Sequence, residues 1–175
     1  MTELVVPRAE FISDVAAYLQ DKQADIVIQQ FNEHHRKFKM VEGQMLQRKA
    51  RLMSKLPEIQ KALDIVTVLH EQGSAGDMVL DYELAESVYA KTRVSKVKHV
   101  NLWLGADVMV EYGLDEAKEL LTNNLANCKA NILNCNKDLE VVKDNLTTLE
   151  VSISRVWNFD VDRRRRAKEM GQPPS

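Results

Sequence analysis

A heptad repeat of apolar residues in the C-terminal half constrains the fold of this chain more than any other feature. Two columns of apolar residues, each advancing by steps of seven and offset from each other by four, run through residues 114–156. The first column is Leu114, Leu121, Cys128, Cys135, Val142, Leu149 and Val156, and the second is Leu125, Ile132, Leu139, Leu146 and Ile153. Apolar columns with polar residues between them are typical of a helix that packs along one seam against another helix. The repeat therefore predicts a coiled-coil helix over residues 114–160.

The N-terminal half carries a matching but less regular repeat. One apolar column steps by seven through Phe31, Phe38, Met45, Leu52, Ile59 and Val66. Its companion column is interrupted by His34, Arg48 and Lys55, and Pro57 removes a backbone donor, which favours a bend. The pattern keeps its phase across Pro57, so it predicts one bent helix over residues 24–72. Two helical stretches of similar length suggest an antiparallel hairpin, although heptads alone would also permit a parallel dimer.

The segment between the two repeats, residues 78–112, changes to a period of two. Short alternating runs rich in Val, Leu, Tyr and Trp are strand signals, and they predict two β-hairpins. So few strands cannot satisfy their own edges, so we expect them to pair with strands of another chain. The residues expected to serve this assembly are Leu80, Tyr82, Leu84, Val88, Tyr89, Val100, Leu102, Trp103, Leu104, Val108 and Val110.

These patterns predict a mainly α fold, namely a long antiparallel coiled-coil hairpin with a small β insert of two β-hairpins at its closed end. The whole chain, residues 1–175, is expected to form a single domain. An N-terminal segment, residues 1–23, precedes the first helix, and residues 161–175 are predicted to form a basic disordered tail.

Motifs that carry enzymatic chemistry are missing from the sequence. No Gly-rich nucleotide loop is present, and no set of carboxylates forms a recognisable acid–base constellation. Cys128 and Cys135 fall in the apolar column and are best interpreted as small hydrophobic residues. The four histidines are scattered, with His34 and His35 pointing about 100° apart on a helix. We therefore expect no enzyme activity, no cofactor and no metal site.

Charge and hydropathy narrow the expected partners and location. The net charge of −2 is no global reason to expect binding to nucleic acid or to an anionic membrane. No apolar stretch approaches the roughly 18 residues of a membrane span, and no secretory signal follows Met1. We expect a cytoplasmic protein. The Arg163–Arg166 run is interpreted first as a solvated tail and second as a nuclear address or a patch for an anionic partner.

Apolar residues near both chain ends suggest a binding surface. An antiparallel hairpin places both ends together, away from the β insert, and apolar residues there could grip apolar surface on a partner. An equally weighted interpretation is that they are ordinary packing residues. The candidate set is Phe11, Ile12, Val15, Val156, Trp157 and Phe159.

Several segments resemble those of eukaryotic prefoldin subunits of the alpha type. The most specific is Val-Asn-Leu-Trp-Leu-Gly-Ala-Asp-Val-Met-Val-Glu-Tyr at residues 100–112, and the likeness extends over about residues 10–166. Segments 56–59, 84–91, 114–117 and 155–161 also resemble the family. This resemblance implies a hexamer of alpha-type and beta-type subunits, joined through their strands. It further implies capture of unfolded actin and tubulin at coiled-coil tips, without ATP, for delivery to the group II chaperonin.

Two other functions remain open on the sequence alone. A nucleic-acid-binding helical arm would need a basic outer face, whereas these helices mix charges and only the tail is basic. A purely structural coiled-coil scaffold explains the heptads but leaves the predicted strands without a purpose. An enzyme is the least favoured class.

Overall fold

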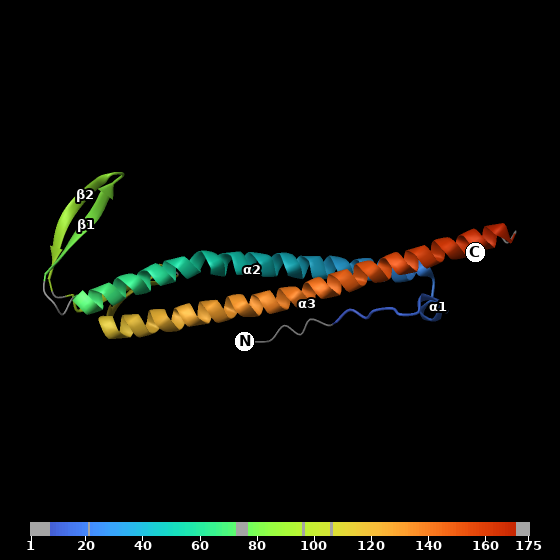
Figure 1. Cartoon of the computed structure of the whole chain (residues 1–175), viewed down its shortest axis with the longest axis horizontal. Helices are drawn as coiled ribbons and strands as arrows, with labels where there is room; N and C mark the ends of the chain where they lie inside the picture. The colour runs from blue at the N-terminus through green and yellow to red at the C-terminus, as the bar shows by residue number, and fades with distance from the viewer. Residues whose placement is uncertain (1–7, 21, 73–76, 96, 106, 171–175) are drawn as a thin grey trace. The chain divides into compact units, whose positions relative to one another are not determined.

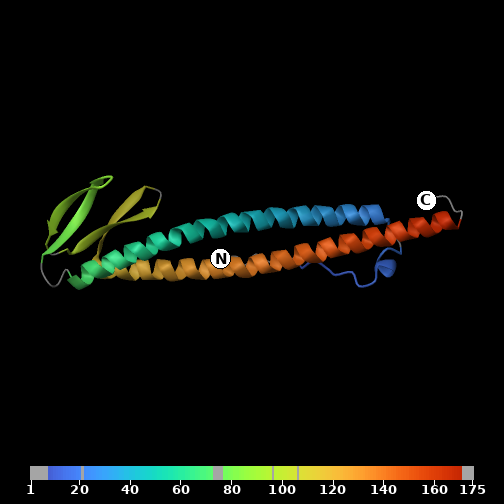
Figure 2. The same cartoon turned by 45° about the horizontal axis from the view of Figure 1, so that its top comes forward.

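The computed structural model describes residues 8–20, 22–72, 77–95, 97–105 and 107–170. Its elements, in order, are α1 (Val15–Tyr18), α2 (Ala24–Gln72), β1 (Met78–Ala85), β2 (Val88–Val94), β3 (His99–Gly105), β4 (Val108–Gly113) and α3 (Leu114–Glu169) (Figures 1 and 2). The chain divides into two compact units: unit 1 comprises residues 1–50 and 133–175, and unit 2 comprises residues 51–132. The predicted fold class is confirmed, because two long helices pack together and two antiparallel β-hairpins lie between them in the chain.

The helices are antiparallel, which rules out the parallel arrangement that the heptads had left open. In unit 1 His35 of α2 lies 2.9 Å from Glu150 of α3. In unit 2 the Cys128 thiol donates to the Leu52 carbonyl oxygen at 3.5 Å. In unit 1, residues 25 and 35 of α2 meet residues 164 and 150 of α3, and in unit 2, residues 52 and 70 of α2 meet residues 128 and 115 of α3. Within each unit the partner numbers fall as the α2 numbers rise. Pro57 lies inside α2 without ending it, as its preserved heptad phase predicted.

The seam is buried mainly on the α3 side. Nine of its buried apolar residues belong to the two predicted columns: Leu121, Leu125, Cys128, Cys135, Leu139, Val142, Leu146, Leu149 and Val156. On α2, the column from Phe31 to Ile59 is only partly buried, and Arg48 and Lys55 of its interrupted companion column are exposed. The two cysteines are free and buried, as expected for small hydrophobic residues.

The N-terminal segment of unit 1 packs on the two helices and completes a core there. The α1 helix has Asp14 as its N-cap, whose carboxylate accepts hydrogen bonds from the backbone of Ala16 at 2.9 Å and of Ala17 at 3.1 Å. The cap begins α1 at Val15, which is one of the residues buried against the two long helices. The buried cluster consists of Ile12, Val15, Leu19, Ala24, Val27 and Val156, with Tyr18, Ile28, Phe31 and Phe159 packed against it.

The predicted disordered tail is wrong for residues 161–169, because α3 continues as a helix to Glu169. Asp160 is almost fully buried and binds Arg163 at 2.8 Å and Arg164 at 2.6 Å. Arg164 also reaches Asp25 at the start of α2, at 3.3 Å. Carboxylates placed three and four residues from arginines stabilise a helix. The composition of this segment indicated a basic tail, because composition does not show that Arg163 and Arg164 pair with Asp160. Residues 171–175 of that predicted tail lie outside the described residues.

The two hairpins of unit 2 share one plan. In each, the strand register shifts one residue before the turn, between Glu83 and Ala85 and between Trp103 and Gly105. Ser87 and Asp107 then adopt positive φ angles of 65° and 59°, as tight turns require. One face of β3–β4 covers the helices, where it packs against the buried cluster of Val66, Ala117 and Leu121.

In the described part of the chain, no helix is both long and apolar enough to cross a membrane. Over the same residues, no group of three or more His, Cys, Asp or Glu side chains is placed to hold a metal ion.

Candidate protein-binding surfaces

The β1–β2 hairpin has one apolar face and one mixed face, which carries its charged residues together with Val79 and Tyr89. On the first face Leu80 lies opposite Thr92 and Tyr82 lies opposite Ala90. The other face carries Asp81 opposite Lys91. Tyr82 is 64% exposed although it belongs to the apolar face. A two-stranded hairpin also has two unpaired edges, so this face is suited to receive a partner.

The β3–β4 hairpin uses its two faces differently. Val100, Leu102 and Tyr112 face inward and pack on the helices of unit 2. On the other face, Trp103 lies opposite Met109, and the indole is 66% exposed. An aromatic residue with that exposure, next to the exposed apolar side chain of Met109, is typical of a protein-binding site.

The predicted assembly residues therefore fall into two groups. Val100 and Leu102 are partly buried against the core of their own chain, and Val110 is also partly buried. The remaining residues are exposed: Leu80, Tyr82, Leu84, Val88, Tyr89, Trp103, Leu104 and Val108. Their role in assembly stays a prediction.

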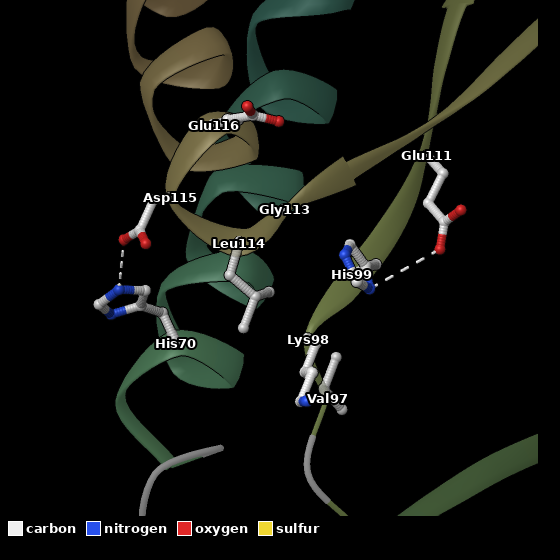
Figure 3. Close-up of a pocket in the computed structure, with 9 residues that line it drawn as sticks. All are labelled: His70, Val97, Lys98, His99, Glu111, Gly113, Leu114, Asp115 and Glu116. Carbon is white, nitrogen blue, oxygen red and sulfur yellow. Dashed lines mark hydrogen bonds and ion pairs between the residues drawn. The ribbon is translucent and has the colours of Figure 1, made fainter.

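An open groove of about 640 Å³ lies where β3, β4 and the ends of both long helices meet in unit 2 (Figure 3). His70 Nε2 is 2.8 Å from Asp115 Oδ1, which ties the end of α2 to the start of α3. His99 Nδ1 is 3.8 Å from Glu111 Oε1, across the two strands. The sequence left these two histidines scattered, whereas the fold brings them to one groove. Each imidazole faces a single carboxylate, which suits a surface ion pair and not a metal site.

The six candidate residues near the chain ends fall into a buried group and an exposed group in unit 1. Ile12, Val15 and Val156 are core residues, and Phe159 packs partly buried against them. Phe11 and Trp157 remain more than half exposed. The interpretation as ordinary packing residues thus describes most of the set, while the exposed aromatic residues remain available to a partner. A role in client binding stays a prediction for all six.

The two exposed aromatic residues lie on different sides of α3. The Phe11 ring lies under the Arg155 guanidinium, 5.2 Å from it. Trp157 follows Arg155 by two residues, which turns it about 200° around the helix. Trp157 and Val161, one turn later, are both exposed and share one side of α3. Unit 1 therefore presents two separate small apolar areas instead of one patch.

Sequence reasoning missed that the N-terminal segment docks on α3. We call residues 8–19 the N-terminal strap; Figures 1 and 2 show it running beside α3. Ala9 N donates to Asn145 Oδ1 at 2.7 Å, and Arg155 Nη2 donates to the Ser13 carbonyl oxygen at 2.9 Å. A signal existed, because Ile12, Val15 and Leu19 are spaced by three and four, as on one face of a helix. The spacing did not indicate which surface these three residues would pack against.

Comparison with known proteins gives one consistent family. The prefoldin subunit family matches residues 38–159. The chain is 37% identical to prefoldin subunit 3 of Homo sapiens over 165 residues, which cover 92% of this chain and 84% of that protein. It is 35% identical to a probable prefoldin subunit 3 of Dictyostelium discoideum over 167 residues, 95% of this chain and 85% of that protein. Prefoldin subunit 3 of Drosophila melanogaster is 32% identical over 165 residues, 93% and 84% of the two chains.

Proposed function

The chain belongs to the prefoldin subunit family, and from that premise we propose that it is an alpha-type subunit of a hexamer that captures unfolded polypeptides. Family membership makes it a chaperone subunit that assembles with other prefoldin subunits, and such subunits are not enzymes. The proposal adds a stoichiometry of two alpha-type and four beta-type subunits. It also adds unfolded actin and tubulin as clients, capture without ATP, and delivery to the cytosolic group II chaperonin.

The observation that carries the proposal is the exposed apolar face of the β1–β2 hairpin. Leu80 and Tyr82 stand on this face with the charged residues turned to the other side. Such a face costs solubility unless it is covered, and a strand from another subunit would cover both the side chains and the free edge. Two hairpins give the chain more edges than one, which suits a subunit with two neighbours.

Client capture is supported by the exposed apolar residues of unit 1. Trp157 and Val161 offer an aromatic and an aliphatic side chain on one side of α3. Aromatic residues contribute most to protein binding when a partner buries them. Small and separate apolar areas suit weak contacts with many sequences, which a chaperone of unfolded chains requires.

We also propose a cytoplasmic location, since the chaperonin that would receive the clients is cytosolic. The alternative of a nuclear address in Arg163–Arg166 competes with the ion pairs of that run. Arg163 and Arg164 both bind Asp160, so half of the basic run takes part in the local structure of unit 1.

Assembly is tested by purifying the chain from its source and weighing the intact complex by native mass spectrometry. Six different small subunits are expected, whereas a homodimer would contradict the proposal. The variant Leu80→Ser with Tyr82→Ser should lose its partner subunits. The matched variant Asp81→Ser with Glu83→Ser, on the opposite face of the same strand, should keep them.

Capture is tested by light scattering of a chemically denatured client diluted into the assembled complex, with and without nucleotide. We expect aggregation to be suppressed equally in both conditions. The variant Trp157→Ser with Val161→Ser should suppress it less well while its subunit composition is unchanged. Unchanged suppression would remove these two residues from the client-binding surface.

A further inference from the structure

Both hydrogen bonds that hold the extended part of the N-terminal strap use the strap's main chain. Asn145 Oδ1 accepts from the Ala9 amide, and Arg155 donates to the Ser13 carbonyl oxygen. Nearly every residue of any polypeptide carries these same two groups. The polar part of this contact is therefore independent of the strap's sequence.

The strap is also extended between these two points. Asn145 and Arg155 are ten residues apart on α3, or about 15 Å along the helix axis. The four residue steps from Ala9 to Ser13 can span at most about 14 Å. A helix would span only about 6 Å over these four steps, and residues 8–13 are accordingly not helical. An extended chain with free main-chain groups is the form that an unfolded polypeptide offers.

Apolar side chains provide the rest of the contact. Ile12, Val15 and Leu19 are buried against Val27 and Val156 of the two long helices. Branched aliphatic side chains of this kind are common in the buried segments of every globular protein. An unfolded chain exposes such segments, so it could fill the same positions.

Two buried polar groups of α3 in this region have no hydrogen-bond partner among the described residues. Ser152 lies on the same stripe of α3 as Asn145, between the two anchors, and it is fully buried. The two groups are the Ser152 hydroxyl and the Asn145 Nδ2 amine. The Asn145 side chain contacts the strap directly, so its amine would regain water when the strap leaves, which offsets part of the free energy that holds the strap down.

We propose that the surface beneath the strap, formed by Val27, Asn145, Arg155 and Val156, is a binding site for an extended apolar segment of an unfolded polypeptide. The strap is its resident occupant, and the client segment displaces it. This inference rests on the proposed function and adds the position of a client site and its control. The apparent affinity for a client then scales with the fraction of molecules whose strap is open.

The first experiment loosens the strap without touching the surface beneath it. In the assembled complex, Ile12→Ser with Val15→Ser removes two buried strap anchors, whereas Ala16→Ser with Ala17→Ser changes two exposed strap residues. The probe is a fluorescein-labelled peptide with the sequence of residues 8–20, followed by fluorescence anisotropy. We expect the first variant to bind the peptide at least several-fold more tightly than the control variant. Equal binding by both would overturn the proposal.

Adding Arg155→Ala to the loosened variant tests whether the peptide uses the strap's own anchors. The exchange removes the donor to the main-chain carbonyl, and it should cancel most of the gain in peptide affinity. A gain that survives in full would place the peptide elsewhere and would contradict the assignment.

Suppression of aggregation separates this inference from the function it rests on. If the wild-type complex fails to suppress aggregation of a denatured client, the proposed function fails, while the peptide experiment still decides whether the surface binds peptides. If the complex suppresses aggregation and Ile12→Ser with Val15→Ser suppresses it more strongly, both stand. If that variant suppresses equally or less, the proposed function survives and the displaced-strap site is rejected.

Discussion

Ser152 is fully buried in α3, and its hydroxyl has no hydrogen-bond partner among the described residues. Replacing it with Ala should stabilise unit 1, because an unpaired buried hydroxyl costs about 1–3 kcal/mol. Alanine also favours the helix over serine by about 0.5 kcal/mol. The small void left by the missing oxygen offsets part of this stabilisation, so we expect a net increase in the stability of unit 1 of about 1–2 kcal/mol.

The measurement is hydrogen–deuterium exchange of the α3 amides in the assembled complex, which reports local opening of unit 1. A gain of about 1.4 kcal/mol should slow exchange roughly tenfold around residue 152. Ser154→Ala is the matched control, because Ser154 is exposed and its hydroxyl donates to the Glu150 carbonyl oxygen at 2.9 Å. That control should change exchange far less. Faster exchange in Ser152→Ala would refute the reasoning, since it would mean that the hydroxyl has a favourable partner.

Four further substitutions test the packing and charges of α3. Asp160→Asn should destabilise the last turns of α3, because it removes the charge that binds Arg163 and Arg164. We expect the local stability of these turns to fall by about 1–3 kcal/mol, which would be measured as faster hydrogen–deuterium exchange over residues 157–169. Glu169→Gln removes an exposed ion pair with Arg165 and should lower the local stability of α3 by less than about 0.5 kcal/mol. A loss equal to that of Asp160→Asn would show that the burial of Asp160 does not make its ion pairs stronger. Val142→Ala deletes a fully buried side chain from the seam and should cost about 2 kcal/mol in the thermal unfolding of the complex, whereas Val151→Ala on the exposed face should be nearly neutral. Similar melting temperatures for the two valine variants would mean that Val142 is not a seam residue.

The candidate surface near the chain ends could be predicted only in part. Apolar composition identified Ile12, Val15 and Trp157 alike, because hydrophobicity does not distinguish a core residue from an exposed binding residue. The strap contacts decide the difference: Ile12 and Val15 are covered by the helices, while Trp157 is turned to the other side of α3. Asn145 and Ser152 gave no signal, because they are polar residues outside the two apolar columns.

The sequence by itself determined the two long helices and the two β-hairpins, but not the short helix α1. Heptad periodicity predicted both long helices and the alternating period predicted both hairpins, because side-chain burial repeats with the geometry of the backbone. Tertiary structure alone decided the direction of the helices, the docking of the strap and the extension of α3 to Glu169. Each of these depends on contacts between residues far apart in the chain, such as Arg155 with Ser13 and Arg164 with Asp25. Local periodicity records which side of a helix is buried, but not what buries it.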